Sequence, residues 1–119
     1  MRIAITSTDG TLDGPVDPRF GRAPYVLVVD TDTDALETID NGANREATQG
    51  AGVNAAQAVI DHHVGWLLTG AIGPKAFAAL NAANIRVAAG QTGTCREALR
   101  RFKDQPPKAV SADQATGPR

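Results

Sequence analysis

Helical and strand-like patterns alternate through the second half of the chain, and this alternation restricts the possible folds most strongly. Apolar residues recur at helical spacing from Gly52 to near His63, and the apolar run 66–69 is typical of a short buried strand. A helix over 74–83, a strand at 85–89 and a third helix from Thr94 are predicted next. Strands separated by helices pair in parallel through right-handed crossovers, so this half predicts an α/β fold.

The first half predicts antiparallel pairing. Residues 2–6 and Tyr25–Asp30 form apolar runs, and a weaker strand at 35–40 follows the polar turn 30–34. The strands over 25–30 and 35–40 are therefore predicted to form a hairpin. Together the halves predict a single-domain mixed sheet of five strands with helices on both faces.

Local signals place the helix ends and the domain boundary. Pro74 suits the first position of a helix, and Thr94 with Glu97 forms the sequence pattern of a capping box. The double proline 106–107 ends the last helix. We therefore expect one domain over 1–104 and a flexible tail over 105–119.

The topology also predicts where a ligand binds. In open α/β sheets the ligand site lies beyond the carboxyl ends of the parallel strands. Three loops should converge there, namely 7–22, 70–73 and 90–94. The last two lead into helix N-termini, where unpaired N–H groups and the helix dipole favour an anion.

The segment Arg19-Phe20-Gly21-Arg22 supports an anion site at this edge of the sheet. Arginine keeps its charge and offers a planar set of donors, and glycine permits close backbone approach. The alternative is a solvated turn before a strand. The expected ligand-binding residues are Arg19, Phe20, Gly21, Arg22, Gly70, Ile72, Gly73, Gly90, Thr92, Gly93 and Thr94.

Charge and composition exclude several classes of function. With a net charge of −1, nothing global attracts nucleic acid or an anionic membrane. No apolar run approaches membrane-spanning length, and the apolar N-terminal stretch 1–5 is too short for a signal peptide. We therefore expect a cytoplasmic protein.

Metal ligands are few in this chain. The single cysteine, Cys95, excludes an internal disulfide and any cysteine-cluster metal site. Its place at a helix N-terminus could lower the thiol pKa and favour ligation, whereas packing is the alternative role. His62 and His63 project about 100° apart on a helix, so we do not expect both to bind one metal ion. Each is a weak ligand candidate, and the alternative role is a helix-end residue that complements the dipole.

Five stretches, taken together, resemble the dinitrogenase iron–molybdenum cofactor biosynthesis family. The resemblance extends from Met1 to about Phe102. It implies a ribonuclease-H-like α/β fold and a role in binding, carrying or inserting molybdenum- and iron-containing sulfur clusters, without catalysis. The stretches that carry it are Arg2-Ile3-Ala4-Ile5, 17–30, 50–56, 69–77 and Gly90-Gln91-Thr92-Gly93.

One departure from the family pattern indicates a particular branch. Members that hold the iron–molybdenum cofactor tend to have a histidine before the Phe-Gly pair, where this chain has Arg19. A guanidinium does not lose its proton to coordinate a metal, so charge and hydrogen bonds are the expected means of binding. The resemblance favours a branch, found in anaerobes, that carries a molybdenum–sulfur–copper cluster without covalent attachment. An iron–molybdenum precursor is the alternative cargo, and the donor and acceptor proteins are unidentified.

Two further functions remain open. A nucleotide- or phosphate-binding regulator could use the loops at Gly70 and Gly90, although no phosphate-loop signature is present. A ribonuclease-H-type phosphotransferase is least favoured because two-metal chemistry needs converging carboxylates. The first strand contains no carboxylate, and the helix that follows Val53 has none before Asp61.

Overall fold

Five strands form one mixed sheet in the computed structural model, which describes residues 1–42, 50–105 and 107. The spatial order is β3-β2-β1-β4-β5. Antiparallel ladders join β1 to β2 and β2 to β3, whereas β1–β4 and β4–β5 pair in parallel. The predicted mixed sheet and its hairpin are confirmed. The strands are β1 (Arg2–Ser7), β2 (Tyr25–Asp30), β3 (Leu36–Asp40), β4 (Trp66–Leu68) and β5 (Arg86–Ala88).

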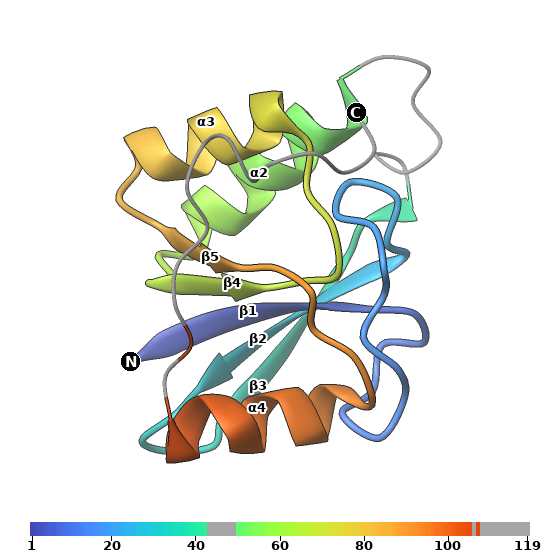
Figure 1. Ribbon diagram of the computed structural model, residues 1–119, viewed down its shortest axis with the longest axis vertical. Helices are drawn as coiled ribbons and strands as arrows, with labels where there is room; N and C mark the ends of the chain where they lie inside the picture. Colours follow the sequence, from blue (N-terminus) through green and yellow to red (C-terminus); the bar gives the residue numbers. More distant parts are fainter. Residues whose placement is uncertain (43–49, 106, 108–119) are drawn as a thin grey trace.

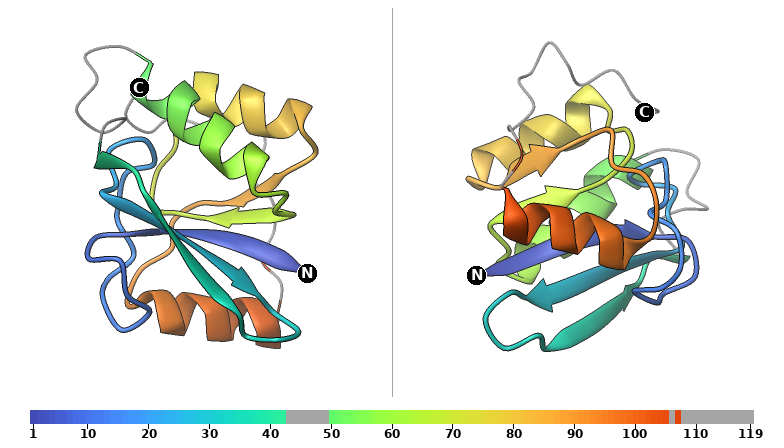
Figure 2. Two further views of the ribbon diagram at one scale, coloured as in Figure 1. Left: turned by 180° about the vertical axis from the view of Figure 1, so that it is seen from behind. Right: turned by 60° about the horizontal axis from the view of Figure 1, so that its bottom comes forward.

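Helices cover both faces of the sheet, as expected. Helices α2 (Ala51–Asp61) and α3 (Pro74–Ala82) lie side by side on one face, and α4 (Cys95–Asp104) covers the other (Figures 1 and 2). The C-terminal ends of α2 and α3 fall one or two residues before the predicted ones, and α2 begins one residue earlier than predicted, at Ala51. His63 and Asn84 adopt left-handed backbone angles, with φ of 55° and 62°, directly after the turns that close α2 and α3. The predicted tail lies outside the described residues apart from Gln105 and Pro107.

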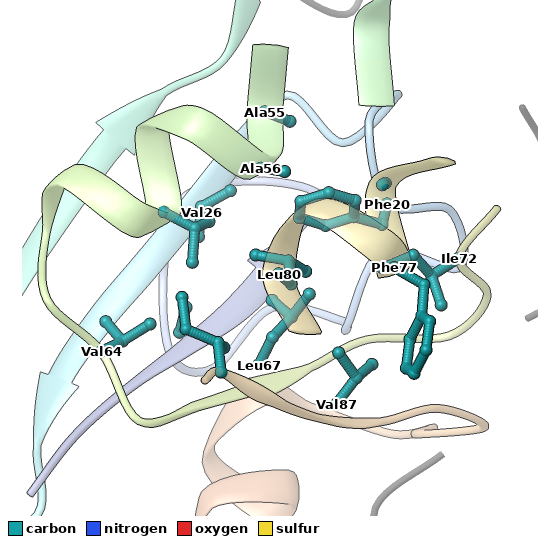
Figure 3. Close-up of a cluster of buried hydrophobic side chains, with 14 of the residues drawn as sticks. Phe20, Val26, Ala55, Ala56, Val64, Leu67, Ile72, Phe77, Leu80 and Val87 are labelled. Atoms are coloured by element: carbon teal, nitrogen blue, oxygen red, sulfur yellow. The ribbon is translucent and has the colours of Figure 1, made fainter. Parts of the chain in front are cut away.

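Two apolar cores follow from the two-residue period of the strands. Ala4 of β1 belongs to the core between the sheet and the helices α2 and α3. Leu67 of β4 and Leu80 of α3 lie in the same core (Figure 3). Their neighbours Ile5 and Leu68 face α4. A sheet buried on both faces explains why β2 is a continuous apolar run rather than an alternating one.

Trp66 is a core residue. It is 7% exposed, and its ring meets that of Phe102 edge-on, with centroids 5.5 Å apart. The guanidinium of Arg86 lies over the Trp66 ring, 5.9 Å from its centroid. Through these two contacts the indole packs α4 and the first residue of β5 against the start of β4.

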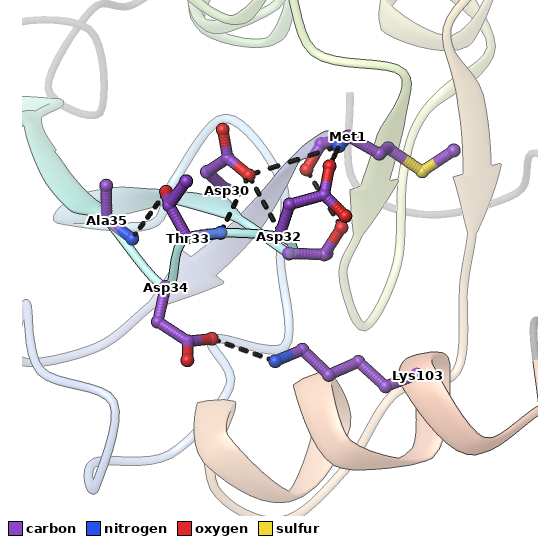
Figure 4. A network of polar contacts seen from close by, with 8 residues as sticks. Met1, Asp30, Asp32, Thr33, Asp34, Ala35 and Lys103 are labelled. Carbon is purple, nitrogen blue, oxygen red and sulfur yellow. Dashed lines mark hydrogen bonds and ion pairs between the residues drawn. The ribbon is translucent and has the colours of Figure 1, made fainter.

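The turn between β2 and β3 is held by its own carboxylates (Figure 4). Asp30 accepts hydrogen bonds from the N–H groups of Asp32 and Thr33 at 2.8 and 3.3 Å, and these bonds lower the pKa of Asp30. Asp34 accepts from Lys103 Nζ of α4 at 2.9 Å. This turn lies at the edge of the sheet where β1 begins, because Asp30 pairs with Arg2.

The predicted capping box at α4 is present. Thr94 Oγ1 accepts the N–H of Glu97 at 3.0 Å, and Glu97 Oε1 accepts the N–H of Thr94 at 2.9 Å. The bond from the Thr94 N–H is the main reason that the pKa of Glu97 is lowered. These two bonds satisfy donors that the helix itself leaves unpaired.

Thr94→Ala is expected to lower the free energy of unfolding by about 1 kcal/mol, because the cap then loses its side-chain acceptor. Urea denaturation at pH 7 measures the change. Thr92→Ala, an exposed position two residues earlier, is the matched control and should change stability little. Equal losses in the two variants would contradict a specific capping role.

Candidate functional site

The loop that carries Arg19 is hydrogen-bonded to the loop after β4. The N–H of Phe20 donates to Ala71 O at 2.9 Å, and the N–H of Ala71 donates to Pro18 O at 2.8 Å. Arg19 and Ala71 thereby form an isolated parallel bridge. Gly70 makes this approach possible, since a Cβ there would lie 2.5 Å from Pro18 O.

The loop after β5 joins the same cluster. The N–H of Gly90 donates to Gly70 O at 2.7 Å, and the N–H of Gln91 donates to Thr69 O at 3.1 Å. On its other side, Gly93 O accepts the N–H of Val16 at 2.9 Å. The convergence of the three loops, predicted from topology, is confirmed.

The corner at Gly21 rests directly on the first turn of α2. Gly21 has a φ of +93°, and a Cβ there would lie 2.9 Å from Gly52 Cα. A Cβ on Gly52 would in turn lie 3.3 Å from the Cβ of Ala76 in α3. The corner therefore lies against the N-terminal turn of α2, which packs in turn on the first turn of α3. The first turn of a helix leaves N–H groups without an intrahelical acceptor and is the positive end of the helix dipole. The contribution of Gly52 was not predicted from the sequence.

The predicted ligand-binding residues differ in their access to solvent. Arg19, Gly90, Thr92 and Gly93 are exposed. The half-buried members of the set are Arg22, Gly70 and Thr94, and the buried ones are Phe20, Gly21, Ile72 and Gly73. The accessible part of the cluster thus comprises the two arginines and the exposed loop backbone, whereas Gly21 and Gly73 are buried.

The predicted role of Phe20 and Ile72 in ligand contact is wrong for their side chains, because these do not line the surface of the site. Each is 2% exposed and belongs to the core between the sheet and the helices α2 and α3 (Figure 3). They anchor the two loops from below and cannot touch a bound ion with their side chains. The sequence signal was ambiguous because a bulky apolar residue beside glycine suits either role.

Thr94 was predicted to bind the ligand, but its polar groups are already bonded within the chain. Its hydroxyl and its N–H are both engaged with Glu97 in the capping box. The N–H groups of Cys95 and Arg96, which follow it, donate to Gly14 O and Leu12 O at 3.0 and 2.7 Å. The N-terminus of α4 is therefore closed by the chain's own acceptors.

Cys95 is a packing residue in this structure. It is fully buried, and its Sγ lies 3.7 Å from the carbonyl oxygens of Thr6 and Pro15. Burial raises the pKa of the thiol to about 11, whereas the sequence suggested a lowered value at the helix N-terminus. Desolvation of the thiolate outweighs the helix dipole here.

The two histidines lie away from the loop cluster. His62 Nδ1 is 2.7 Å from Ala58 O, and its Nε2 is 3.3 Å from Glu37 Oε2 of β3. They follow the C-terminus of α2, about 16 Å along the helix from the turn that meets Gly21. Within residues 1–42, 50–105 and 107, no three His, Cys, Asp or Glu side chains are grouped to hold a metal.

Two polar residues outside the predicted ligand-binding set hold the corner. Asp17 is 8% exposed, and its Oδ1 accepts the N–H of Arg19 at 3.0 Å. Asn41 is 1% exposed, and its Nδ2 donates to Ala23 O at 2.9 Å. The position of Asp17 just before the motif was a weak signal, whereas Asn41 lies far along the chain and gave none.

Gly70→Ala is expected to lower the free energy of unfolding by about 1–3 kcal/mol, because the new Cβ would overlap the backbone of Pro18. Guanidinium denaturation measures the loss. Gly65→Ala is the matched control, since a Cβ there would have its nearest neighbours at 3.9 Å. Equal costs at the two positions would show that the close approach at Gly70 is not what matters.

None of the helices in the described part of the chain combines the length and apolar composition that a bilayer span needs.

No curated protein sequence matches the chain. Among solved structures, the apo form of the orange protein from Desulfovibrio gigas is 50% identical, with a TM-score of 0.89 and 92% of each chain covered. A putative NifB protein from Thermotoga is 30% identical, with a TM-score of 0.77 and coverage of 88% of this chain and 89% of that one. The family model described as dinitrogenase iron-molybdenum cofactor matches residues 1–105. The chain therefore belongs to the dinitrogenase iron–molybdenum cofactor family.

Proposed function

We propose that the protein is a non-catalytic carrier of an anionic molybdenum-containing metal–sulfur cluster, of the molybdenum–sulfur–copper type, bound without covalent attachment at the loop cluster. One observation carries the proposal. The corner with Arg19 and Arg22 lies against the N-terminal turn of α2, where Gly21 contacts Gly52, and Gly52 in turn packs on Ala76 of α3.

Local charge favours an anion at this place. The chain as a whole carries a net charge of −1, so attraction must come from the site itself. The Arg19 side chain is exposed, and its guanidinium has no carboxylate partner among the described residues. Two guanidinium groups and two helix N-termini create a positive surface, and planar guanidinium groups bind large, weakly hydrated anions well.

The positions of the soft and nitrogen ligands favour non-covalent binding. Cys95 is buried with a raised pKa, and His62 and His63 lie beyond the far end of α2. No cysteine or histidine among the described residues therefore adjoins the arginine corner. Hydrogen bonds from Arg19, Arg22 and loop N–H groups are the remaining means of holding a sulfido cluster.

The family relationship supports a role in handling metal clusters and leaves two cargoes to distinguish. The family description names the iron–molybdenum cofactor, so a precursor of that cofactor is the alternative cargo. Arg19 in place of the histidine that precedes the Phe-Gly pair in members that hold the iron–molybdenum cofactor favours the molybdenum–sulfur–copper cargo.

Anaerobic purification followed by metal analysis and visible spectroscopy tests the proposal. The protein is analysed as isolated, then after addition of tetrathiomolybdate with copper(I), and in parallel with an iron–molybdenum precursor. Uptake of molybdenum and copper in a fixed ratio, with an intense visible band, is the expected result. No uptake of either cargo, together with saturable binding of ATP or GTP, would replace the carrier with a nucleotide-binding regulator.

A further inference from the structure

We propose that Asp17 and Asn41 are positioning residues that hold the arginine corner, residues 18–24, in its anion-binding shape. This inference rests on the proposed function, because it concerns the same site. Neither side chain needs to touch the ligand. Each fastens one end of the corner to the sheet, Asp17 where the chain enters and Asn41 where it leaves.

Asp17 uses its backbone and its side chain together at the entrance. Its N–H donates to Thr6 O at 3.0 Å, and its carbonyl accepts Thr6 Oγ1 at 3.0 Å, so the backbone is tied to β1. Its carboxylate accepts the N–H of Arg19 at 3.0 Å and Thr8 Oγ1 at 3.3 Å. These bonds orient the peptide that carries the Arg19 side chain.

Asn41, which directly follows β3, binds the C-terminal part of the corner. Its Nδ2 donates to Ala23 O at 2.9 Å and to Gly21 O at 3.5 Å. Its own N–H donates to Pro24 O at 2.8 Å. Three carbonyl groups of the corner are thereby bonded to one buried residue, which fixes the backbone where the corner ends.

The chemistry of Asp17 indicates positioning rather than direct binding. A carboxylate two residues from Arg19 repels an anionic ligand, so its charge alone would weaken binding. Its contribution must come from the acceptor that orders the Arg19 peptide. Ordering the site before the ligand arrives lowers the entropic cost of binding.

Three variants separate these effects, with the dissociation constant for tetrathiomolybdate plus copper(I) measured at a temperature where each protein is fully folded. Asp17→Ala should weaken binding about tenfold, equivalent to about 1.4 kcal/mol. Asp17→Asn should bind as tightly as the original protein or more tightly, because Oδ1 remains and the charge is gone. Asp30→Ala is the matched control, since Asp30 caps backbone N–H groups in the same way at the opposite edge of the sheet, and its binding should not change.

The inference is overturned if Asp17→Ala binds like the original protein, if Asp17→Asn loses as much as Asp17→Ala, or if Asp30→Ala loses as much. If Asp17→Ala does not fold, Thr8→Val replaces it; loss of the bond to Oδ2 should weaken binding about threefold, and unchanged binding would again overturn the inference. Absence of binding by the original protein would instead reject the proposed function, so the two failures are distinguishable.

Discussion

Replacing Arg19 and Arg22 together by alanine is expected to weaken cluster binding about a hundredfold and to leave the fold intact. A hydrogen bond to a charged group contributes about 1.5–3 kcal/mol, so losing two guanidinium groups should cost about 3 kcal/mol, or two factors of ten. Arg19 is exposed and Arg22 half-buried, so little of the core is disturbed. Molybdenum content after desalting and the dissociation constant at several salt concentrations measure the effect.

A double variant with the same change in net charge provides the control. Arg2 and Arg86 begin β1 and β5, at the edge of the sheet opposite the loop cluster. Arg2→Ala combined with Arg86→Ala should retain the cluster. Unchanged metal occupancy in the Arg19 and Arg22 double variant would refute the arginine site. Equal losses of metal in both double variants would show that the loss comes from the change in net charge and not from the position of the arginines.

Phe20→Ala is expected to lower the free energy of unfolding by about 3–5 kcal/mol, a large part of the stability of a domain of this size. Its ring lies in the core with Ile72 and Phe77, and the variant leaves a cavity beneath the corner (Figure 3). Because the corner rests on this ring, cluster binding should weaken even in the folded fraction. Denaturant unfolding and binding measured at low temperature separate the two losses.

The control for this variant is Leu36→Ala on the edge strand β3. Leu36 is 46% exposed, so its truncation should change stability by about 0.5 kcal/mol or less. A Phe20→Ala variant as stable as Leu36→Ala would contradict the anchoring role. A destabilised Phe20→Ala protein that binds the cluster normally would show that the corner keeps its shape without the ring.

Much of the candidate site could be predicted because its parts are local. The residue types of Arg19, Gly21 and Arg22 favour an anion, and anion binding there stays a prediction. The topology rule placed the loops at Gly70 and Gly90 at the same edge, where the structure has them. The roles of Phe20 and Thr94 could not be separated from ligand contact in the same way. Whether a side chain faces solvent or core depends on which other segment packs over it.

The sequence by itself determined the elements and their order. The apolar run of β2, the apolar period of α2, the proline at the start of α3 and the capping box of Thr94 with Glu97 all depend on neighbours a few residues away. They can therefore be recognised from the sequence alone. Only the tertiary structure decided how Gly21 meets Gly52, how Asn41 binds the corner, and why the pKa of Cys95 rises instead of falling. Each of these depends on groups brought together from distant parts of the chain, where close approach and loss of water outweigh local preference.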